Sequence, residues 1–357
     1  MMTWFLLVVG LVLLVYGADL LVKGAARLAA NFGVPALIIG LTVVAFGTSA
    51  PELAVSVKAA YSGQAELAIA NAVGSNIFNT LFILGAAALI TPLVISKQLI
   101  RQDVPIMIGV SILAVVLTLD GDIVTWEASL LVACLVGYTG FLMYQGKKQN
   151  TNIAEGEVAE LLEVKTPIWS NLALVVVGLV LLVVGARWLV NAAVEIATMW
   201  GVNEAVIGLT IIAAGTSLPE VVTSIVATIR GQRDIAVGNV VGSNIFNILS
   251  VLGFSGLVSP IPLIAGEQLS QVDIPVMLGA AILCLPLFYI GAVLHRMEGA
   301  IFLVLYIAYV WYLIAVALPL DYLPTLQNSI LFGLLPLTFI YIFFSLIRDL
   351  HKRRAQV

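Results

Sequence analysis

The chain has 357 residues, of which 61% are hydrophobic and only 10% are charged, and its mean hydropathy is +1.12. So apolar a composition cannot cover a water-facing surface of ordinary size, which excludes a soluble globular protein. The formal net charge of -4 says little about partners, because in a membrane protein the position of the charges matters more than their sum, and a nucleic-acid partner is not indicated. We therefore predict an integral membrane protein in contact with the lipid bilayer.

Long apolar stretches follow one another along the chain, each about 20 residues long, which is the length of a membrane-spanning helix. They lack the alternation of polar and apolar positions that a membrane β-barrel requires, so an all-α polytopic membrane protein is predicted. The first stretch has no basic region before it and is interpreted as a spanning helix, not as a signal peptide. The predicted helices form two series of five and one extra: residues 4 to 29, 36 to 60, 67 to 90, 104 to 119 and 125 to 145, then 169 to 198, 204 to 229, 235 to 258, 273 to 291 and 299 to 318, and finally 329 to 347.

Aspartate and proline mark the expected starts of two of these helices. Asp103 precedes Pro105 by two residues, and Asp273 precedes Pro275 in the same way. Aspartate is a favoured helix cap and proline is favoured in the first helical turn. Both aspartates are therefore expected to cap their helices, the fourth and the ninth.

A polar segment rich in Lys and Glu separates the two series and is interpreted as a solvated linker. The predicted division is residues 1–145 for the first five-helix repeat and 146–168 for a cytoplasmic linker. Residues 169–318 are then predicted to form the second repeat, and residues 319–357 to hold an eleventh transmembrane helix and a basic cytoplasmic tail.

The distribution of basic residues predicts the orientation, because cytoplasmic loops of membrane proteins carry an excess of Lys and Arg. With the N-terminus outside, fourteen of the sixteen Lys and Arg residues, Arg230 among them, lie on the inner side. Only Lys58 and Arg187 fall outside. Asp19, the counterpart of Arg187, is expected toward the outer end of its helix, where a gating or snorkelling role is an alternative to a structural one.

A twelve-residue segment occurs twice in the chain. LTVVAFGTSAPE, from Leu41 to Glu52, returns 168 residues later as LTIIAAGTSLPE, from Leu209 to Glu220, and the same offset relates two copies of GSNIFN. The chain is therefore a duplicated structure. Because five helices, an odd number, separate equivalent points, the second repeat crosses the membrane in the opposite sense, which gives the inverted repeats of many secondary transporters.

The repeated segment places a glutamate directly after a proline inside an apolar helix, as Pro51 with Glu52 and as Pro219 with Glu220. An ionisable group at this depth is energetically expensive and indicates a functional site. Proline kinks or breaks the helix and frees backbone carbonyl groups. Such groups are tolerated in a membrane only where protein or a water-filled cavity satisfies them.

Both motifs present side-chain oxygens four residues apart, so that each pair lies on one helix face. Oxygen ligands suit hard cations such as Ca²⁺, Na⁺ or Mg²⁺, whereas zinc and copper sites normally recruit imidazole or thiolate. Two ionised glutamates carry a charge of -2, which one Ca²⁺ or two Na⁺ can balance. Protons are an alternative, because burial of a carboxylate favours its neutral, protonated state. The pairs are Thr48 with Glu52, Thr216 with Glu220, Ser75 with Asn79 and Ser243 with Asn247.

The paired G-[ST]-S-x-P-E and G-S-N-x-x-N motifs resemble the repeat motifs of the sodium/calcium exchanger family, within the calcium/cation antiporter superfamily. The chain looks like a prokaryotic member, and the resemblance covers its first ten helices. It implies one cluster of ion sites with the glutamates at its centre, and a first and a sixth helix that act as a sliding gate pair. The implied ligands are Thr48, Ser49, Glu52, Ser75, Asn79, Thr216, Ser217, Glu220, Ser243 and Asn247, with the backbone carbonyls of Ala45 and Ala213.

The resulting prediction is a secondary antiporter that exchanges Ca²⁺ for Na⁺ by alternating access, in a bacterial or archaeal cell membrane. It is not an enzyme and holds no permanent cofactor, so the transported cations are its ligands, while its oligomeric state is left open. A cation/H⁺ antiporter on the same fold is the alternative. An intramembrane hydrolase, a protein of a different class, is disfavoured because this chain has no mid-membrane histidine that could act as the base for a serine nucleophile. A passive channel is disfavoured by inverted repeats with broken helices.

Overall fold

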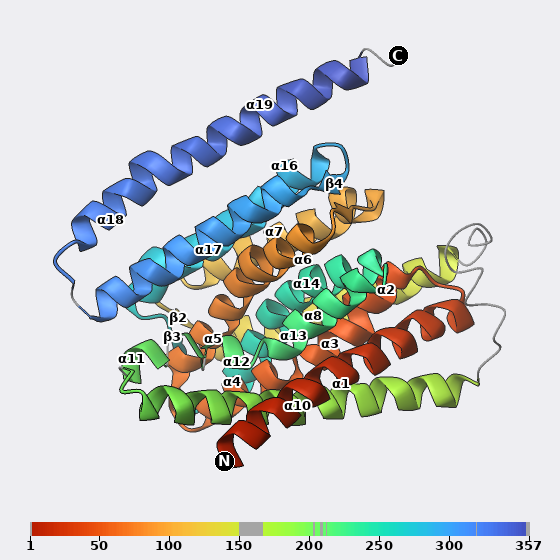
Figure 1. The fold of residues 1–357 in the computed structure, drawn as a ribbon, viewed down its shortest axis with the longest axis horizontal. Helices are drawn as coiled ribbons and strands as arrows, with labels where there is room; N and C mark the ends of the chain where they lie inside the picture. The colour runs from red at the N-terminus through yellow and green to blue at the C-terminus, as the bar shows by residue number, and fades with distance from the viewer. Residues whose placement is uncertain are drawn as a thin grey trace.

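The computed structural model describes residues 2–149, 167–202, 204–207, 210–211, 213–318 and 320–354, and they form a bundle of long helices (Figure 1). Most of the predicted linker lies outside the described residues. The first series comprises α1 (Met2–Phe32), α2 (Ala36–Ile39), α3 (Ala45–Thr48), α4 (Ala50–Tyr61), α5 (Ala65–Ile77), α6 (Leu84–Ile90), α7 (Val104–Leu117) and α8 (Thr125–Gln149).

The second series repeats this order, and an additional helix follows it. Its helices are α10 (Ile168–Met199), α11 (Glu204–Ile207), α12 (Ala213–Gly215), α13 (Leu218–Ile229), α14 (Arg233–Phe246), α15 (Gly253–Val258), α16 (Ile274–Tyr289) and α17 (Arg296–Ala317), then α18 (Leu323–Ser329) and α19 (Leu335–Arg354). Several spans are interrupted by π-helical turns: η1 (Gly40–Val44), η2 (Phe78–Ile83), η3 (Leu99–Asp103), η5 (Asn247–Leu252), η6 (Leu269–Asp273) and η7 (Ile330–Leu334).

Within the described residues, nine helices are long and apolar enough to span a membrane, and the pair Ala36–Thr48 and Ala50–Tyr61, bent by 44°, makes a tenth. The predicted all-helical polytopic architecture is confirmed. The seventh predicted helix is described only in pieces, of which α13 is a shorter apolar helix. The stretch Leu323–His351 is one of the nine and lies at the edge of the bundle, beside α16 and α17 (Figure 1). The orientation with the N-terminus outside stays a prediction.

The centre of the bundle is formed by the third helix of each series. In the most apolar 18-residue stretch of Arg233–Val258, 100% of the residues are buried inside the protein. The corresponding share is 72% for Ala65–Ile90 and 33% for Met2–Phe32. The helices that carry the two GSNIFN copies are therefore shielded by protein, which is the environment that polar side chains at membrane depth require.

Helices α1 and α10 cross in antiparallel directions at very short range (Figure 1). A Cβ atom added to Gly17 would lie 2.8 Å from the carbonyl oxygen of Gly178, and one added to Gly10 would lie 2.9 Å from that of Gly185. Only glycine allows two backbones to approach this closely. The antiparallel crossing of these two equivalent helices is the arrangement that inverted repeats require.

Two short antiparallel sheets join loops of one repeat to loops of the other. β1 (Leu93–Val94) pairs with β4 (Val293–Leu294), and β2 (Asp122–Ile123) pairs with β3 (Leu263–Ile264). Because β1 precedes α7 and β2 follows it, the two sheets lie at opposite ends of that helix. Each end of the bundle is thus fastened across the repeat boundary.

The fourth and ninth helices begin earlier than predicted, with the turns η3 and η6. Asp103 and Asp273 have helical backbone angles, and neither side chain makes a capping hydrogen bond. The prediction that they cap these helices is wrong. A π-helical turn precedes Pro105 and Pro275 in each case, and this wider turn lets the helix continue where a proline would interrupt regular α-helical bonding.

Asp19 of α1 forms ion pairs with Lys23 on its own helix and with Arg230 at the end of α13, both over 2.6 Å. The contact places Asp19 and Arg230 at one level of the bundle. The prediction that they lie toward opposite sides of the membrane is therefore wrong. Asp19 lies just past the middle of α1, which runs from Met2 to Phe32, and so nearer the C-terminal end that the predicted orientation places inside.

Candidate cation site

Both motif helices are broken at the serine of the GTSxPE sequence. Ser49 separates α3 from α4 with φ -80° and ψ 4°, and Ser217, before α13, has φ -88° and ψ 6°. The following prolines, Pro51 and Pro219, lie in the first turn of the new helix, where their missing N–H removes no helical hydrogen bond. The break therefore starts a new helix, with the motif glutamate in its first turn.

The two glutamates are completely buried and each contacts the serine of the other repeat. Ser217 donates a hydrogen bond from Oγ to Oε1 of Glu52 over 2.8 Å, and Ser49 donates one to Oε1 of Glu220 over 3.0 Å. The structure thus brings the two broken helices together at one point. The reciprocal pairs combine the carboxylates of both repeats in a single site.

Several predicted ligand oxygens in this site have no hydrogen-bond partner among the described residues. A buried polar atom without a partner loses free energy relative to water, and few are tolerated in native proteins. A hard cation bound among these oxygens would supply the missing interaction. The atoms are Oε2 of Glu52, Oε2 of Glu220, Oδ1 of Asn79, Oγ of Ser243 and Oδ1 of Asn247.

The other predicted ligands are held by hydrogen bonds near the same point. Oγ of Ser75 lies 3.1 Å from Oγ of Ser217, and because the single proton of Ser217 goes to Glu52, the Ser75 hydroxyl is the donor in this contact. The carbonyl oxygen of Ala45 accepts from the Ser49 N–H over 3.0 Å and from the Thr48 hydroxyl over 3.3 Å. Both lone pairs of that carbonyl are therefore engaged in this conformation. Its counterpart, Ala213, is the first residue of α12.

Two asparagines that the sequence reasoning missed connect the repeats. Asn71 donates from Nδ2 to Oγ of Ser56 over 2.9 Å and to the carbonyl oxygen of Glu52 over 3.2 Å, and it accepts from the hydroxyl of Thr216 over 3.4 Å. The residue therefore links the helix after one break to the threonine before the other.

Asn239 makes the equivalent set of bonds in the second repeat. It donates to Oγ of Ser224 over 3.0 Å and to the carbonyl oxygen of Glu220 over 3.5 Å, and it accepts from the Thr48 hydroxyl over 3.1 Å. Asn71 and Asn239 lie 168 residues apart, as do the two serines that they contact. A search for polar residues that recur at the 168-residue offset would have identified both asparagines and both serines from the sequence.

The direction of the threonine bonds matters for the chemistry of the site. A hydroxyl has one proton and two lone pairs. Thr216 gives its proton to Asn71, and the single Thr48 proton is shared between Asn239 at 3.1 Å and the Ala45 carbonyl at 3.3 Å, so the lone pairs of both hydroxyls remain available. An oxygen arranged in this way can act as a cation ligand.

The charge of the site comes from the two glutamates alone. The described part of the chain holds no group of three or more His, Cys, Asp or Glu residues that could bind a metal. The remaining donors are neutral hydroxyl and amide oxygens. A low count of charged ligands is typical of weaker, exchangeable Ca²⁺ sites, because affinity rises with ligand charge.

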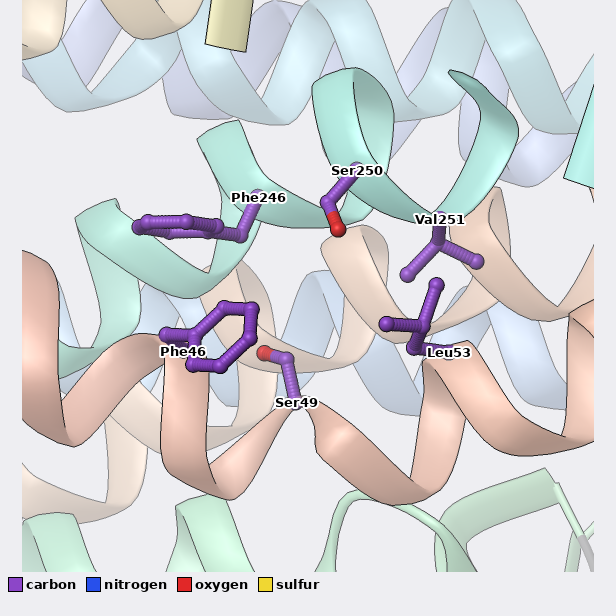
Figure 2. Close-up of a pocket in the computed structure, with 6 residues that line it drawn as sticks. All are labelled: Phe46, Ser49, Leu53, Phe246, Ser250 and Val251. Atoms are coloured by element: carbon purple, nitrogen blue, oxygen red, sulfur yellow. The ribbon is translucent and has the colours of Figure 1, made fainter. Parts of the chain in front are cut away.

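An apolar pocket lies beside the site and reaches Ser49 (Figure 2). The rings of Phe46 and Phe246, both in its lining, meet edge to face with their centroids 5.7 Å apart and an angle of 61° between the planes. Figure 2 shows Ser49 and Ser250 pointing toward the pocket from opposite walls. Its lining residues are Phe46, Ser49, Leu53, Phe246, Ser250 and Val251.

A bundle of spanning helices, two matched halves and one buried pair of carboxylates define a membrane transporter for cations. A family model described as sodium/calcium exchanger protein matches residues 2–144 and 170–315. The chain therefore belongs to the sodium/calcium exchanger family. It is a multi-pass membrane antiporter for cations and not an enzyme, as predicted.

Individual relatives agree with this assignment. The chain is 39% identical over 305 residues to a putative antiporter, CaxA, of Alkalimonas amylolytica, which covers 84% of this chain and 95% of that protein. It is 32% identical over 342 residues to the sodium/calcium exchanger MaX1 of Methanosarcina acetivorans, with 86% and 97% covered. A 40% identical relative over 263 residues, covering 71% and 79%, is the inner membrane protein YrbG of Escherichia coli.

A solved structure of the sodium-calcium exchanger NCX_Mj, soaked with Na⁺ and Sr²⁺, superposes on this fold with a TM-score of 0.74. The two sequences are 33% identical, and the match covers 88% of this chain and 97% of that one. The prediction of a prokaryotic member of the family is confirmed.

Proposed function

We propose that this protein exchanges Ca²⁺ for Na⁺ across the membrane through the site between its two broken helices. The observation that carries the proposal is the pair of completely buried glutamates, each with one oxygen bound by a serine of the opposite repeat and one oxygen that has no partner among the described residues. Two ionised carboxylates are neutralised by one Ca²⁺ or by two Na⁺. Competition for the same buried charge then couples the two ions.

The proposed side-chain ligands fall into three chemical groups, and two backbone carbonyls complete the set. The two carboxylates supply charge, the serine and threonine hydroxyls supply lone pairs, and the two amides supply carbonyl oxygens, all of which are ligand types that hard cations prefer. A relative of solved structure was soaked with Na⁺, Ca²⁺ and Sr²⁺ in different combinations, which supports cations of these kinds as the cargo. The proposed set is Thr48, Ser49, Glu52, Ser75, Asn79, Thr216, Ser217, Glu220, Ser243 and Asn247, with the carbonyls of Ala45 and Ala213.

Alternating access requires an element that covers and uncovers the site, and the α1 and α10 pair is suited to it. Side chains of α10 lie directly against both breaks, since a Cβ atom added to Gly47 would lie 2.7 Å from Leu179, and one added to Gly215 would lie 2.7 Å from Val190. The pair is held together by its glycine contacts. Its movement as one body past the broken helices would change access to the site without separating the ligands.

The carbonyl of Ala45 is engaged by two hydrogen bonds in this conformation. For that oxygen to act as a ligand, the Thr48 hydroxyl must release it. The bond from Thr48 to Asn239 is shorter, at 3.1 Å against 3.3 Å, and offers the proton an alternative acceptor. Cation binding is thus expected to strengthen the contact between Thr48 and Asn239.

The proposal is tested with the purified full-length chain in lipid vesicles, by following ⁴⁵Ca²⁺ uptake under an imposed Na⁺ gradient or an imposed pH gradient. We expect the Na⁺ gradient alone to drive uptake, and excess Sr²⁺ to compete with it. Uptake driven only by the pH gradient would replace the proposal with cation/H⁺ exchange on the same fold. Absence of uptake under both gradients would refute Ca²⁺ as the cargo.

A further inference from the structure

A second layer of buried amides supports the proposed ligands. Asn76 and Asn244 follow the ligand serines of the two GSNIFN copies, and each is 2% exposed. The two are equivalent under the 168-residue offset, and Nδ2 of each approaches a methionine sulfur, Met277 at 3.7 Å for Asn76 and Met107 at 3.4 Å for Asn244. Their other contacts differ.

Asn76 fixes the amide of Asn247. The Nδ2 atom of Asn247 donates to Oδ1 of Asn76 over 3.0 Å. The oxygen and the nitrogen of a side-chain amide are bonded to the same carbon and lie in one plane, so a hydrogen bond that fixes the nitrogen also determines where the oxygen points. That oxygen, Oδ1 of Asn247, is buried and has no partner among the described residues.

The equivalent bond is missing in the other half of the site. Neither Nδ2 nor Oδ1 of Asn79 has a partner among the residues described, and Oδ1 of Asn244, the atom that would correspond to the acceptor on Asn76, has none either. The amide of Asn79 is therefore not fixed in direction, while that of Asn247 is.

One difference between the repeats accounts for this asymmetry. Thr80 occupies the position equivalent to Ile248. The Nδ2 atom of Asn244 donates to the Thr80 hydroxyl over 2.7 Å, whereas Nδ2 of Asn76, with no hydroxyl at Ile248, donates to the backbone carbonyl of Asn244 over 3.0 Å. A single hydroxyl thus holds the two supporting asparagines in different arrangements.

We infer that Asn76 is a positioning residue that directs the amide oxygen of Asn247 toward the cation, and that Thr80 withholds Asn244 from the same role toward Asn79. The two repeats therefore contribute one fixed and one adjustable amide ligand. A site that binds ions of different charge in turn benefits from a ligand that can rotate. This inference rests on the proposed function, because it takes Asn247 as a ligand.

The test measures the KM for Ca²⁺ and the maximal rate of Na⁺-driven uptake in vesicles for the wild type, Asn76→Leu, Asn247→Ala and the double variant. Residues that orient a metal ligand typically change affinity about 10-fold to 100-fold when replaced. We expect each single variant to raise KM at least about tenfold. The double variant should be no worse than the poorer single one, because Asn76 acts through Asn247.

Asn244→Leu is the matched control, since it replaces the equivalent asparagine with the same side chain. It should lower thermal stability as much as Asn76→Leu does, with a KM shift below about threefold, because Asn244 orients no ligand. A purely structural role for Asn76 would change stability but would leave KM alike in the two variants. Equal KM shifts, or effects of Asn76→Leu and Asn247→Ala that multiply, would overturn the inference.

A second pair of variants avoids loss of folding. Ile248→Thr offers Asn76 the hydroxyl that Thr80 offers Asn244, so it should draw Asn76 from Asn247 and raise KM several-fold. Thr80→Val removes the hydroxyl that holds Asn244, which frees Asn244 to accept from Nδ2 of Asn79 as Asn76 accepts from Nδ2 of Asn247, so KM should fall or stay unchanged and should not rise. The opposite order would refute the proposed cause. If the wild type shows no Na⁺-driven uptake, the proposed function is refuted, and this inference with it. If wild-type uptake is normal, the variants test the inference alone.

Discussion

Glu52→Gln and Glu220→Gln each remove one negative charge from the buried pair while nearly preserving the shape of the side chain. At an effective dielectric constant of about 20, two unit charges roughly 4 Å apart interact by about 4 kcal/mol. A loss of this size corresponds to roughly a thousandfold weaker cation binding. Either variant is therefore expected to reduce exchange below detection.

The same substitutions should not destabilise the fold. A glutamine retains an oxygen that can accept the hydrogen bond from Ser217 or Ser49, which now reaches Oε1 of the glutamate. Removing an uncompensated buried charge is often neutral or stabilising, because the desolvation of that charge is avoided. Without added cations, each variant should unfold at a temperature equal to or above that of the wild type.

Thermal unfolding in detergent with and without Ca²⁺ separates these two effects. A ligand that binds only the folded state at about 100 times its Kd stabilises it by about 2.7 kcal/mol. The wild type should show such a Ca²⁺-dependent increase in unfolding temperature, and both glutamine variants should lose it. Retained uptake, or a retained Ca²⁺-dependent shift, in both variants would refute the view that the carboxylates bind the ion.

Three further predictions follow from individual contacts. Ser217→Ala removes a hydrogen bond to the charged Glu52, an interaction of about 1.5 to 3 kcal/mol, so KM for Ca²⁺ in vesicle uptake should rise by about tenfold or more; an unchanged KM would show that the bond does not organise the site. Gly17→Ala forces a Cβ against the backbone of α10 and should lower the unfolding temperature by an amount equivalent to about 1 to 3 kcal/mol. Gly109→Ala should not lower it, because the added atom meets nothing within 4 Å. Equal effects of the two variants would contradict the close crossing of α1 and α10. Asp19→Asn removes the ion pair with Lys23 within α1 and the one with Arg230 at the end of α13, which in a partly exposed position contribute at most about 1 kcal/mol. It should therefore change the initial exchange rate by less than about fivefold with KM unaltered, and a large rise in KM would instead place Asp19 in the cation site.

Hydropathy and duplication made most of the fold and most of the proposed ligand set predictable from the sequence. A bilayer accepts only long apolar segments with satisfied backbones, so the spans are visible as continuous apolar stretches. The 168-residue offset selects the polar positions that recur in both halves. Applied to every polar position, the same offset would also have identified Asn71 and Asn239.

Hydropathy could not locate helix ends where a π-helical turn absorbs a proline. Asp103 has the sequence context of a cap and nevertheless lies inside a continuous helical stretch, because the turn before it widens. Capping signals describe the isolated helix start and carry no information on the turn that packing imposes before it.

Sequence alone determined that two glutamates lie at membrane depth in related halves, because charge, apolar surroundings and repetition are all properties of the linear chain. Tertiary structure decided which serine contacts which glutamate, that Asn71 and Asn239 link the halves, and that Asn76 holds Asn247 while Asn79 has no such support. These are hydrogen bonds between groups more than 140 residues apart, such as the 171 residues between Asn76 and Asn247. Their geometry follows from how the helices pack, and one hydroxyl at Thr80 is enough to make equivalent residues behave differently.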